Sequence, residues 1–73
     1  MPMIDVHVIK GVFSAEQKRD MIEKITDTMV DIEGESLREV TWVRIREINS
    51  GEWGIGGRPF STDDMKALQG IAG

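Results

Sequence analysis

The fold is decided by residues 3–25, MIDVHVIKGVFSAEQKRDMIEKI. Residues 3–9 alternate between an apolar and a mixed face, and this period of two predicts a β-strand. The apolar face carries Ile4, Val6 and Val8. Gly11 breaks the run, and Ser14 with Gln17 has the spacing of a capping box, in which each side chain accepts a backbone N–H at the start of a helix. We therefore expect a helix to begin after Ser14.

This helix is expected to end at Gly34, which is a natural C-cap. Apolar residues recur along it at three- and four-residue spacings, a pattern typical of a buried stripe. The stripe consists of Met21, Ile22, Ile25, Met29 and Ile32. Residues 41–48 are rich in Val, Ile, Thr and Trp and predict a second strand. Two strands joined by a helical crossover most naturally lie parallel with a right-handed connection, so the central unit is βαβ.

The remainder of the chain is short. Residues 49–51 predict a turn, residues 54–57 predict a flexible glycine-rich stretch, and residues 61–64 offer caps for a short closing helix. The sequence contains no repeat, linker or low-complexity segment. We expect residues 1–73 to form a single domain of the α/β (α+β) class.

Chain length limits how stable such a domain can be alone. A chain of 73 residues and 8.2 kDa buries a small core and usually needs a supplement. The sequence has no cysteine, which excludes disulfides, and its single histidine cannot build a zinc site of the usual Cys/His type. Oligomerisation is the remaining supplement.

Charge and hydropathy exclude several classes of partner. A formal net charge of -4 and a pI near 4.8 give no basic surface for nucleic acid or an anionic membrane. The apolar stretches are too short to span a membrane, and the N-terminus lacks the features of a signal peptide. We expect a soluble, cytoplasmic protein.

Most polar motifs of the chain do not identify a reaction. The glycine cluster lacks the third glycine of a dinucleotide fingerprint and is followed by Arg58-Pro59 in place of a helix, so it predicts a turn better than a phosphate site. His7 is interpreted as a partly buried structural residue, because no nucleophile accompanies it. Asp5 lies on the same strand face, where it either pairs with His7 or is solvated. Trp53 fits a pocket wall or interface anchor as well as it fits simple packing.

Pro2 offers a specific chemical possibility. In an X-Pro amide the nitrogen carries no proton and has no basic lone pair. Removal of Met1, which a small second residue normally permits, would expose a titratable secondary amine. Burial of that amine in an apolar pocket lowers its pKa toward neutrality, so that it could move a proton next to a carbonyl.

The chain as a whole resembles the 4-oxalocrotonate tautomerase family from Pro2 to about Arg58. The resemblance rests on the Met1-Pro2 start, the strand that ends near Gly11, the Ser-Ala-Glu-Gln-Lys helix opening and the βαβ order. Its most specific element is the stretch Gly-Glu-Trp-Gly-Ile-Gly-Gly at residues 51–57, which is similar to the family's glycine turn.

The resemblance implies roles for two residues and an assembly. In the family the N-terminal proline is the catalytic base, which corresponds to Pro2. The aromatic residue of the glycine turn lines the pocket and helps to keep the proline pKa low, which corresponds to Trp53. Family subunits typically assemble as a hexamer, a trimer of dimers, with pockets built by neighbouring chains. No metal or organic cofactor is implied.

Both family arginines that bind substrate are absent from their expected places. Val12 follows Gly11 where the first arginine would stand, and Trp42 occupies the position of the second. Arg44 shares the strand face of Trp42 and is the candidate replacement, with Arg46 as the alternative. The pocket is therefore expected to be more apolar and aromatic than that of a dicarboxylate enzyme.

These features predict an isomerase that interconverts the keto and enol forms of a small carbonyl acid. Pro2 would move the proton, Trp53 and Trp42 would line the site, and Arg44 would stabilise the carboxylate or enolate. One alternative is hydration or dehalogenation of an unsaturated acid, as in some relatives of the family. Another is a non-catalytic assembly module of the same fold.

Overall fold

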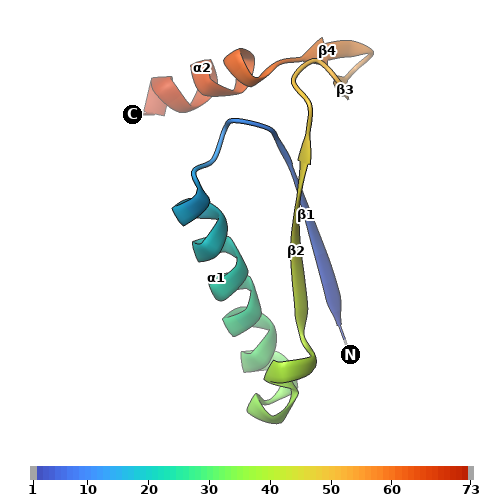
Figure 1. The fold of residues 1–73 in the computed structure, drawn as a ribbon, viewed down its shortest axis with the longest axis vertical. Helices are drawn as coiled ribbons and strands as arrows, with labels where there is room; N and C mark the ends of the chain where they lie inside the picture. Colours follow the sequence, from blue (N-terminus) through green and yellow to red (C-terminus); the bar gives the residue numbers. More distant parts are fainter. Residues whose placement is uncertain (1, 73) are drawn as a thin grey trace. The chain divides into compact units, whose positions relative to one another are not determined.

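The computed structural model describes residues 2–72, with side chains described up to residue 70. The elements are, in chain order, β1 (Met3–Ile9), α1 (Ala15–Glu33), the 3₁₀ helix η1 (Glu35–Val40), β2 (Trp42–Ile48), β3 (Trp53–Ile55), β4 (Arg58–Phe60) and α2 (Thr62–Ala72) (Figure 1). The chain divides into two compact units. Unit 1 consists of Met1–Val6 and Ser14–Arg46, and unit 2 of His7–Phe13 and Glu47–Gly73.

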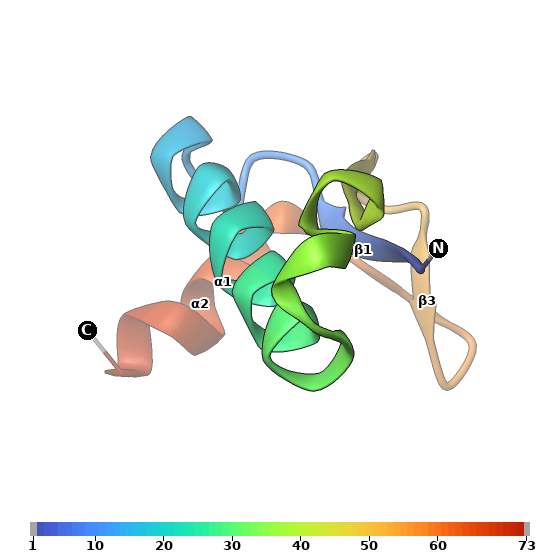
Figure 2. The same ribbon diagram turned by 90° about the horizontal axis from the view of Figure 1, so that it is seen from below.

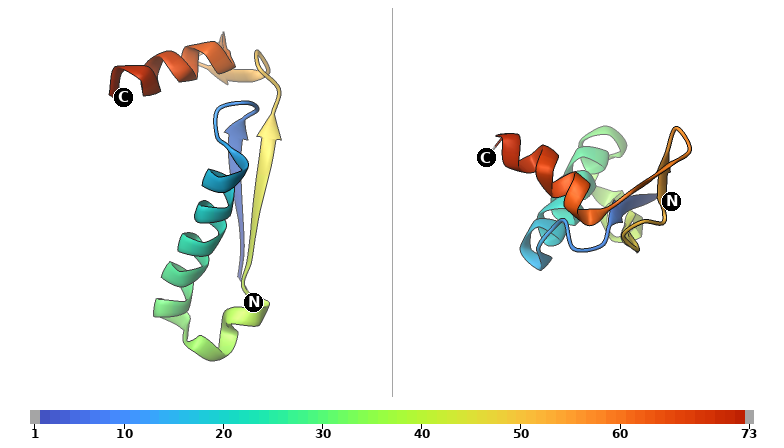
Figure 3. Two further views of the ribbon diagram at one scale, coloured as in Figure 1. Left: turned by 60° about the vertical axis from the view of Figure 1, so that its left-hand side comes forward. Right: turned by 90° about the horizontal axis from the view of Figure 1, so that it is seen from above.

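Strands β1 and β2 are hydrogen-bonded neighbours. In unit 1 the amide of Trp42 donates to the carbonyl of Pro2 at 3.0 Å, and farther along the same strands Arg44 pairs with Asp5. Both strands therefore advance in the same direction, as their arrows show in Figure 3. The predicted parallel βαβ arrangement is confirmed, and the bounds of the first strand agree with the prediction.

Helix α1 begins as its capping box predicts. The Ser14 amide donates to Gln17 Oε1 at 2.9 Å, and the Gln17 amide donates to Ser14 Oγ at 3.1 Å. At the other end the Gly34 amide donates to the Val30 carbonyl at 2.8 Å, with Gly34 at a φ of 106° that favours glycine. Both ends of the helix are therefore satisfied locally.

The predicted apolar stripe of α1 is only partly correct. Met21, Ile25 and Met29 are half-buried, but Ile22 is 39% and Ile32 is 78% exposed. The buried residue of this helix is Val30, which the stripe did not include. The spacing of the apolar residues determines which face of the helix they share. It does not show whether another element packs against that face and buries them.

Element η1 fills the polar stretch between α1 and β2 and is the short coil that follows α1 in Figure 2. Arg38 joins the two helices, because Nη1 lies 2.8 Å from Asp27 Oδ1 and Nε lies 3.0 Å from Glu35 Oε2. These hydrogen bonds raise the pKa of Arg38 above its ordinary value. The guanidinium therefore remains charged.

In unit 2, residues 53–60 form a β-hairpin where the sequence predicted only a flexible stretch. Strands β3 and β4 are antiparallel, with Trp53 opposite Phe60 and Ile55 opposite Arg58. Gly56 and Gly57 form the two-residue loop, and their φ angles are 59° and 81°. A type I′ turn requires positive φ at both central positions, which two glycines adopt without strain. The glycines therefore order this segment.

Helix α2 begins after a second capping box. The Asp64 amide donates to Ser61 Oγ at 3.0 Å, and the Ser61 amide donates to Asp64 Oδ2 at 2.9 Å. Within unit 2, the Thr62 amide also donates to Ser50 Oγ, and its hydroxyl donates to the Lys10 carbonyl. The predicted closing helix is confirmed, and Figure 3 shows the hairpin leading into it.

Burial is sparse in the described part of the chain. The buried apolar side chains are Val30 in unit 1 and Val8 and Ile9 in unit 2, which are 6%, 7% and 2% exposed. No helix in residues 2–72 has the length and hydropathy needed to cross a bilayer.

Candidate active site

Pro2 is held at the beginning of the parallel strand pair. Its carbonyl accepts the hydrogen bond from the Trp42 amide, and the residue is half-buried. The proline nitrogen has no N–H within the chain and takes no part in the strand ladder. The ladder therefore fixes the position of Pro2 without engaging the atom that would act as a base. Met1, whose removal the sequence predicts, lies outside the described residues.

One face of β2 presents an aromatic ring followed by two guanidinium groups. Trp42 is 51% exposed, and the side chains of Arg44 and Arg46 are 44% and 52% exposed. The intervening residues Val43 and Ile45 are half-buried, which confirms that the exposed three share a face. Alternate residues of a strand lie about 7 Å apart. The Trp42 ring and the Arg44 guanidinium are therefore close enough to contact one small ligand.

Arg44 forms a two-point ion pair with Asp5 on β1. Arg44 Nε lies 2.8 Å from Asp5 Oδ1, and Nη2 lies 3.1 Å from Oδ2. Hydrogen bonding to Asp5, followed by the attraction of its charge, raises the pKa of Arg44 above its ordinary value. The sequence interpretation placed Asp5 in solvent or beside His7 and did not predict its pairing with Arg44. The parallel register brings Asp5 beside Arg44.

Arg46 lies farther from the same carboxylate. Its Nε is 3.9 Å from Asp5 Oδ2, at the limit of an ion pair. Asp5 therefore stands between two guanidinium groups, and the three side chains carry a formal net charge of +1. We call Asp5, Arg44 and Arg46 the strand-face triad.

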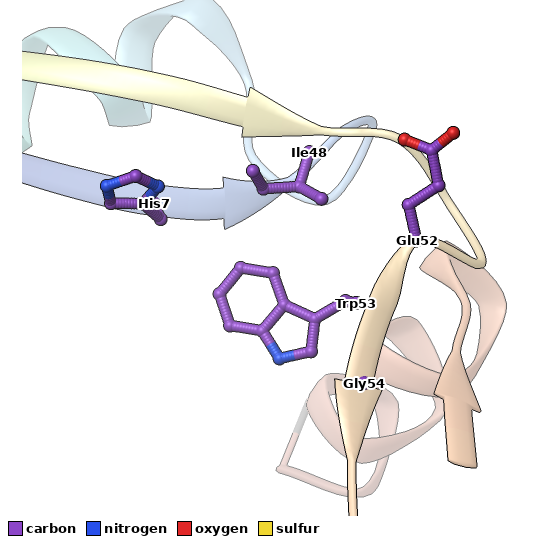
Figure 4. A pocket seen from close by; sticks show the side chains of 5 residues that line it. All are labelled: His7, Ile48, Glu52, Trp53 and Gly54. Atoms are coloured by element: carbon purple, nitrogen blue, oxygen red, sulfur yellow. The ribbon is translucent and has the colours of Figure 1, made fainter. Parts of the chain in front are cut away.

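In unit 2, Trp53 lines a pocket of about 330 Å³ together with His7, Ile48, Glu52 and Gly54. Figure 4 shows the indole of Trp53 extending toward His7 of β1 and Ile48 of β2, whereas the carboxylate of Glu52 is directed away from the indole. His7 is exposed, so its interpretation as a partly buried structural residue was wrong. Its neighbour in the pocket, Trp53, comes from a hairpin that the sequence analysis did not predict.

The candidate residues thus fall into two groups. Unit 1 brings together Pro2, Trp42 and Arg44 through one backbone hydrogen bond and one strand face. Unit 2 places Trp53 in its own pocket. Asp5 and His7 were not predicted as site residues, although the alternation of β1 had already placed both on the mixed face. Among residues 2–72, no group of three or more His, Cys, Asp or Glu side chains is arranged to hold a metal ion.

Comparison with known proteins identifies relatives along nearly the whole chain. A sequence model of the tautomerase family, described as "Tautomerase enzyme", matches residues 2–63. The chain is similar to the probable tautomerase K2 of Dickeya dadantii (strain 3937), with 37% identity over 67 residues, which cover 92% of this chain and 98% of that protein. The crystal structure of DmpI from Helicobacter pylori superposes with a TM-score of 0.62 and 27% identity, over 90% of this chain and 94% of that one.

These matches confirm the resemblance and the fold class that the sequence predicted. They cover β1, α1, β2 and the glycine-rich hairpin, which are the elements that carry the candidate residues. They also support tautomerase activity, and therefore an isomerase, at the level of the family. The chain belongs to the tautomerase family.

Proposed function

We propose that this protein isomerises the enol and keto forms of a small carbonyl acid, with the amine of Pro2 as the general base once Met1 has been removed. The observation that carries the proposal is the position of Pro2. Its carbonyl is fixed by Trp42, two residues before an arginine on the same strand face. One end of a single strand pair thus supplies a proton acceptor, an aromatic surface and a cation.

The chemistry requires one group that accepts and returns a proton. The neutral Pro2 amine accepts the enol O–H proton while the carbonyl C=O forms and the C=C electron pair moves to carbon. The resulting ammonium then delivers the proton to that carbon, which regenerates the amine. Such proton transfer contributes about 10²- to 10⁴-fold in rate. An amine with a pKa near neutrality suits both steps, and burial in an apolar pocket would lower the pKa of the amine in this direction.

Arg44 supplies the positive charge for the substrate. Its contact with Asp5 uses Nε and one side of Nη2, and a guanidinium has five N–H donors. The edge formed by Nη1 and the other side of Nη2 is therefore available to a substrate carboxylate or enolate oxygen. Charge-assisted hydrogen bonds of this kind are the strong ones. Trp42 would cover the apolar part of the same substrate.

Trp53 is proposed as an aromatic wall that limits water access to the amine. Because the resemblance implies pockets built by neighbouring chains, Pro2 and Trp53 of one pocket need not belong to the same chain. Exposed apolar side chains support assembly, because Met3, Ile32, Ile55 and Leu68 are each more than half exposed. The hexamer, a trimer of dimers, and the cytoplasmic location are part of this proposal.

The test is enol-to-keto conversion of phenylenolpyruvate by protein whose intact mass shows that Met1 is absent. We expect activity in the Met1-free protein and a lower rate in Pro2→Ala, which after loss of Met1 presents a primary amine in place of the secondary one. A loss of at least about 10²-fold is expected where Met1 is retained, since the contribution of a general base is then removed. Material that retains Met1 is the matched control, because it has the same side chains but an amide at Pro2. Equal activity in all three preparations would exclude Pro2 as the base.

The hydration and dehalogenation alternative receives less support from the pocket. Activation of water would need a carboxylate that faces the substrate and can accept a proton. The Glu52 carboxylate is directed away from Trp53 (Figure 4), and the Asp5 carboxylate is engaged by two hydrogen bonds from Arg44. The non-catalytic alternative is decided by the same assay, because it predicts no Pro2-dependent conversion of any enol acid.

A further inference from the structure

We infer that Asp5 sets the substrate class of the proposed active site by cancelling one of its two positive charges, so that the site selects enol acids with a single carboxylate. This inference rests on the proposed function. The inference goes beyond that function because it assigns a positioning and specificity role to Asp5, which does not carry out the chemistry.

The geometry of the strand-face triad supports this role. Asp5 is held by two hydrogen bonds from Arg44, at 2.8 and 3.1 Å, and it lies 3.9 Å from Arg46 Nε. The Asp5 side chain is 28% exposed, less than either arginine. The carboxylate is therefore fixed between the guanidinium groups and acts on both of them.

The charge balance then decides what can bind. Without Asp5, the two arginines would present a charge of +2, which matches a dicarboxylate. With Asp5 the triad carries +1, and one negative charge of a dianionic ligand would remain uncompensated. In a solvent-exposed site with a water-like dielectric, one unit charge at about 4 Å changes binding about fivefold. The half-exposed Trp42 ring lies beside the triad on β2, so the rest of the preferred substrate is apolar or aromatic.

Asp5 also orients Arg44. A two-point contact fixes the plane of a guanidinium as well as its position. The Nη1 edge of Arg44 is consequently held in one direction instead of sampling several rotamers. Asp5 is thus a positioning residue for the group that binds the substrate.

A matched pair of substrates tests the inference. Phenylenolpyruvate has one carboxylate, and its 4-carboxyphenyl derivative adds a second carboxylate to the same ring. In Asp5→Asn the triad gains one positive charge, so the ratio of kcat/KM for the dicarboxylate to that for the monocarboxylate should rise about fivefold, mainly through a lower KM for the dicarboxylate. Asp31→Asn, an exposed change on α1, alters the net charge of the chain equally and should leave the ratio unchanged.

Restoration of the charge provides the decisive comparison. Arg46→Gln lowers the triad to a net charge of zero and should weaken binding of both substrates. The double variant Asp5→Asn with Arg46→Gln returns the triad to +1 and should return the ratio to that of the parent. A general loss of folding in Asp5→Asn would lower the kcat/KM for both substrates together and would leave their ratio unchanged. Asp5→Glu is a further control, because it keeps the charge and should preserve the parental ratio of kcat/KM.

Two outcomes would overturn the inference. One is an unchanged ratio in Asp5→Asn, and the other is a raised ratio that persists in the double variant. In both cases a Pro2-dependent rate with phenylenolpyruvate shows that the proposed function itself holds. Loss of the proposed function would be recognised separately, because the parent protein would then convert neither substrate in a Pro2-dependent way.

Discussion

At the scale of single residues, Trp42 distinguishes this site most clearly from the pattern of the family. By the resemblance it stands where the family has a substrate-binding arginine, and half of its surface is exposed beside the strand-face triad. An indole binds rings and alkyl chains by area and by aromatic stacking, and it supplies no charge. In the proposed site, a tryptophan in place of an arginine would therefore shift recognition from charge toward shape and apolar contact.

Trp42→Ala should consequently raise the KM for phenylenolpyruvate about two- to tenfold, which corresponds to the roughly 0.5–1.5 kcal/mol of an aromatic pair. The measurement is a steady-state comparison with a small aliphatic enol acid, for which the change should be smaller. Trp42→Phe is the control, because it keeps an aromatic ring. An equal loss for aryl and aliphatic substrates would show that Trp42 does not contact the ring.

The sequence could predict some residue contacts of this site and not others. The pairing of Asp5 with Arg44 follows from two correctly assigned strand faces, and a trial alignment of parallel strands could have found it. The exposure of His7 could not be predicted in this way, because strand alternation assigns a face but does not say what covers it. The pocket at His7 depends on a hairpin remote in the sequence.

At the scale of elements, the helices begin where the sequence predicts because their start signals are local. Both Ser14 and Ser61 form reciprocal hydrogen bonds with the residue three positions later. The β3–β4 hairpin was missed although Gly-Gly is a hairpin signal, because the strands have three residues each and Pro59 disfavours a strand assignment. Pro59 is tolerated here since a two-stranded sheet consists of edges only.

The cap of α2 leads to a prediction about pH. Hydrogen bonds from the Ser61 amide and then from its hydroxyl lower the pKa of Asp64 below its ordinary value of 3.8. A lowered pKa adds stability that is present above the unfolded-state pKa and is lost as the pH falls through the folded-state pKa. We expect the amides in the first turn of α2 to lose protection from hydrogen exchange on acidification below about pH 4.

Ser61→Ala removes only the hydroxyl, so it should raise the pKa of Asp64 part of the way toward 3.8. Loss of the N-cap hydroxyl should destabilise the start of α2 by about 1 kcal/mol. Carboxyl titration by NMR measures the first effect, and hydrogen exchange measures the second. Ser14→Ala, which removes the equivalent cap of α1, should leave the Asp64 titration unchanged. Because the Ser61 amide is kept in this variant, an unaltered Asp64 pKa would show that the Ser61 hydroxyl does not contribute to lowering it.

At the scale of the whole molecule, the small number of buried side chains limits the stability of a separate chain. Three apolar side chains are buried among the described residues, whereas Met3 and Trp42 are about half exposed on one face of the β1–β2 pair. A chain of this length usually depends on a further source of stability. The sequence predicted this need from length and the absence of cysteine, but the partner surfaces cannot be derived from one chain.

We therefore expect the thermal midpoint to rise with protein concentration, because association stabilises the folded state by mass action. Sedimentation should give a mass of about six times the chain mass of 8.2 kDa. A species of 8.2 kDa whose midpoint does not depend on concentration would contradict the proposed assembly.

The hydrogen bond between Pro2 and Trp42 has a practical consequence for recombinant work. Because the strand ladder uses the Pro2 carbonyl and not its nitrogen, residues added before Pro2 would remove no backbone hydrogen bond. An N-terminal affinity tag should thus yield protein that folds and purifies normally, yet it would convert the amine into an amide. Activity screens that use such fusions would score this protein as inert, so a C-terminal tag or a protease that leaves Pro2 first is the appropriate design.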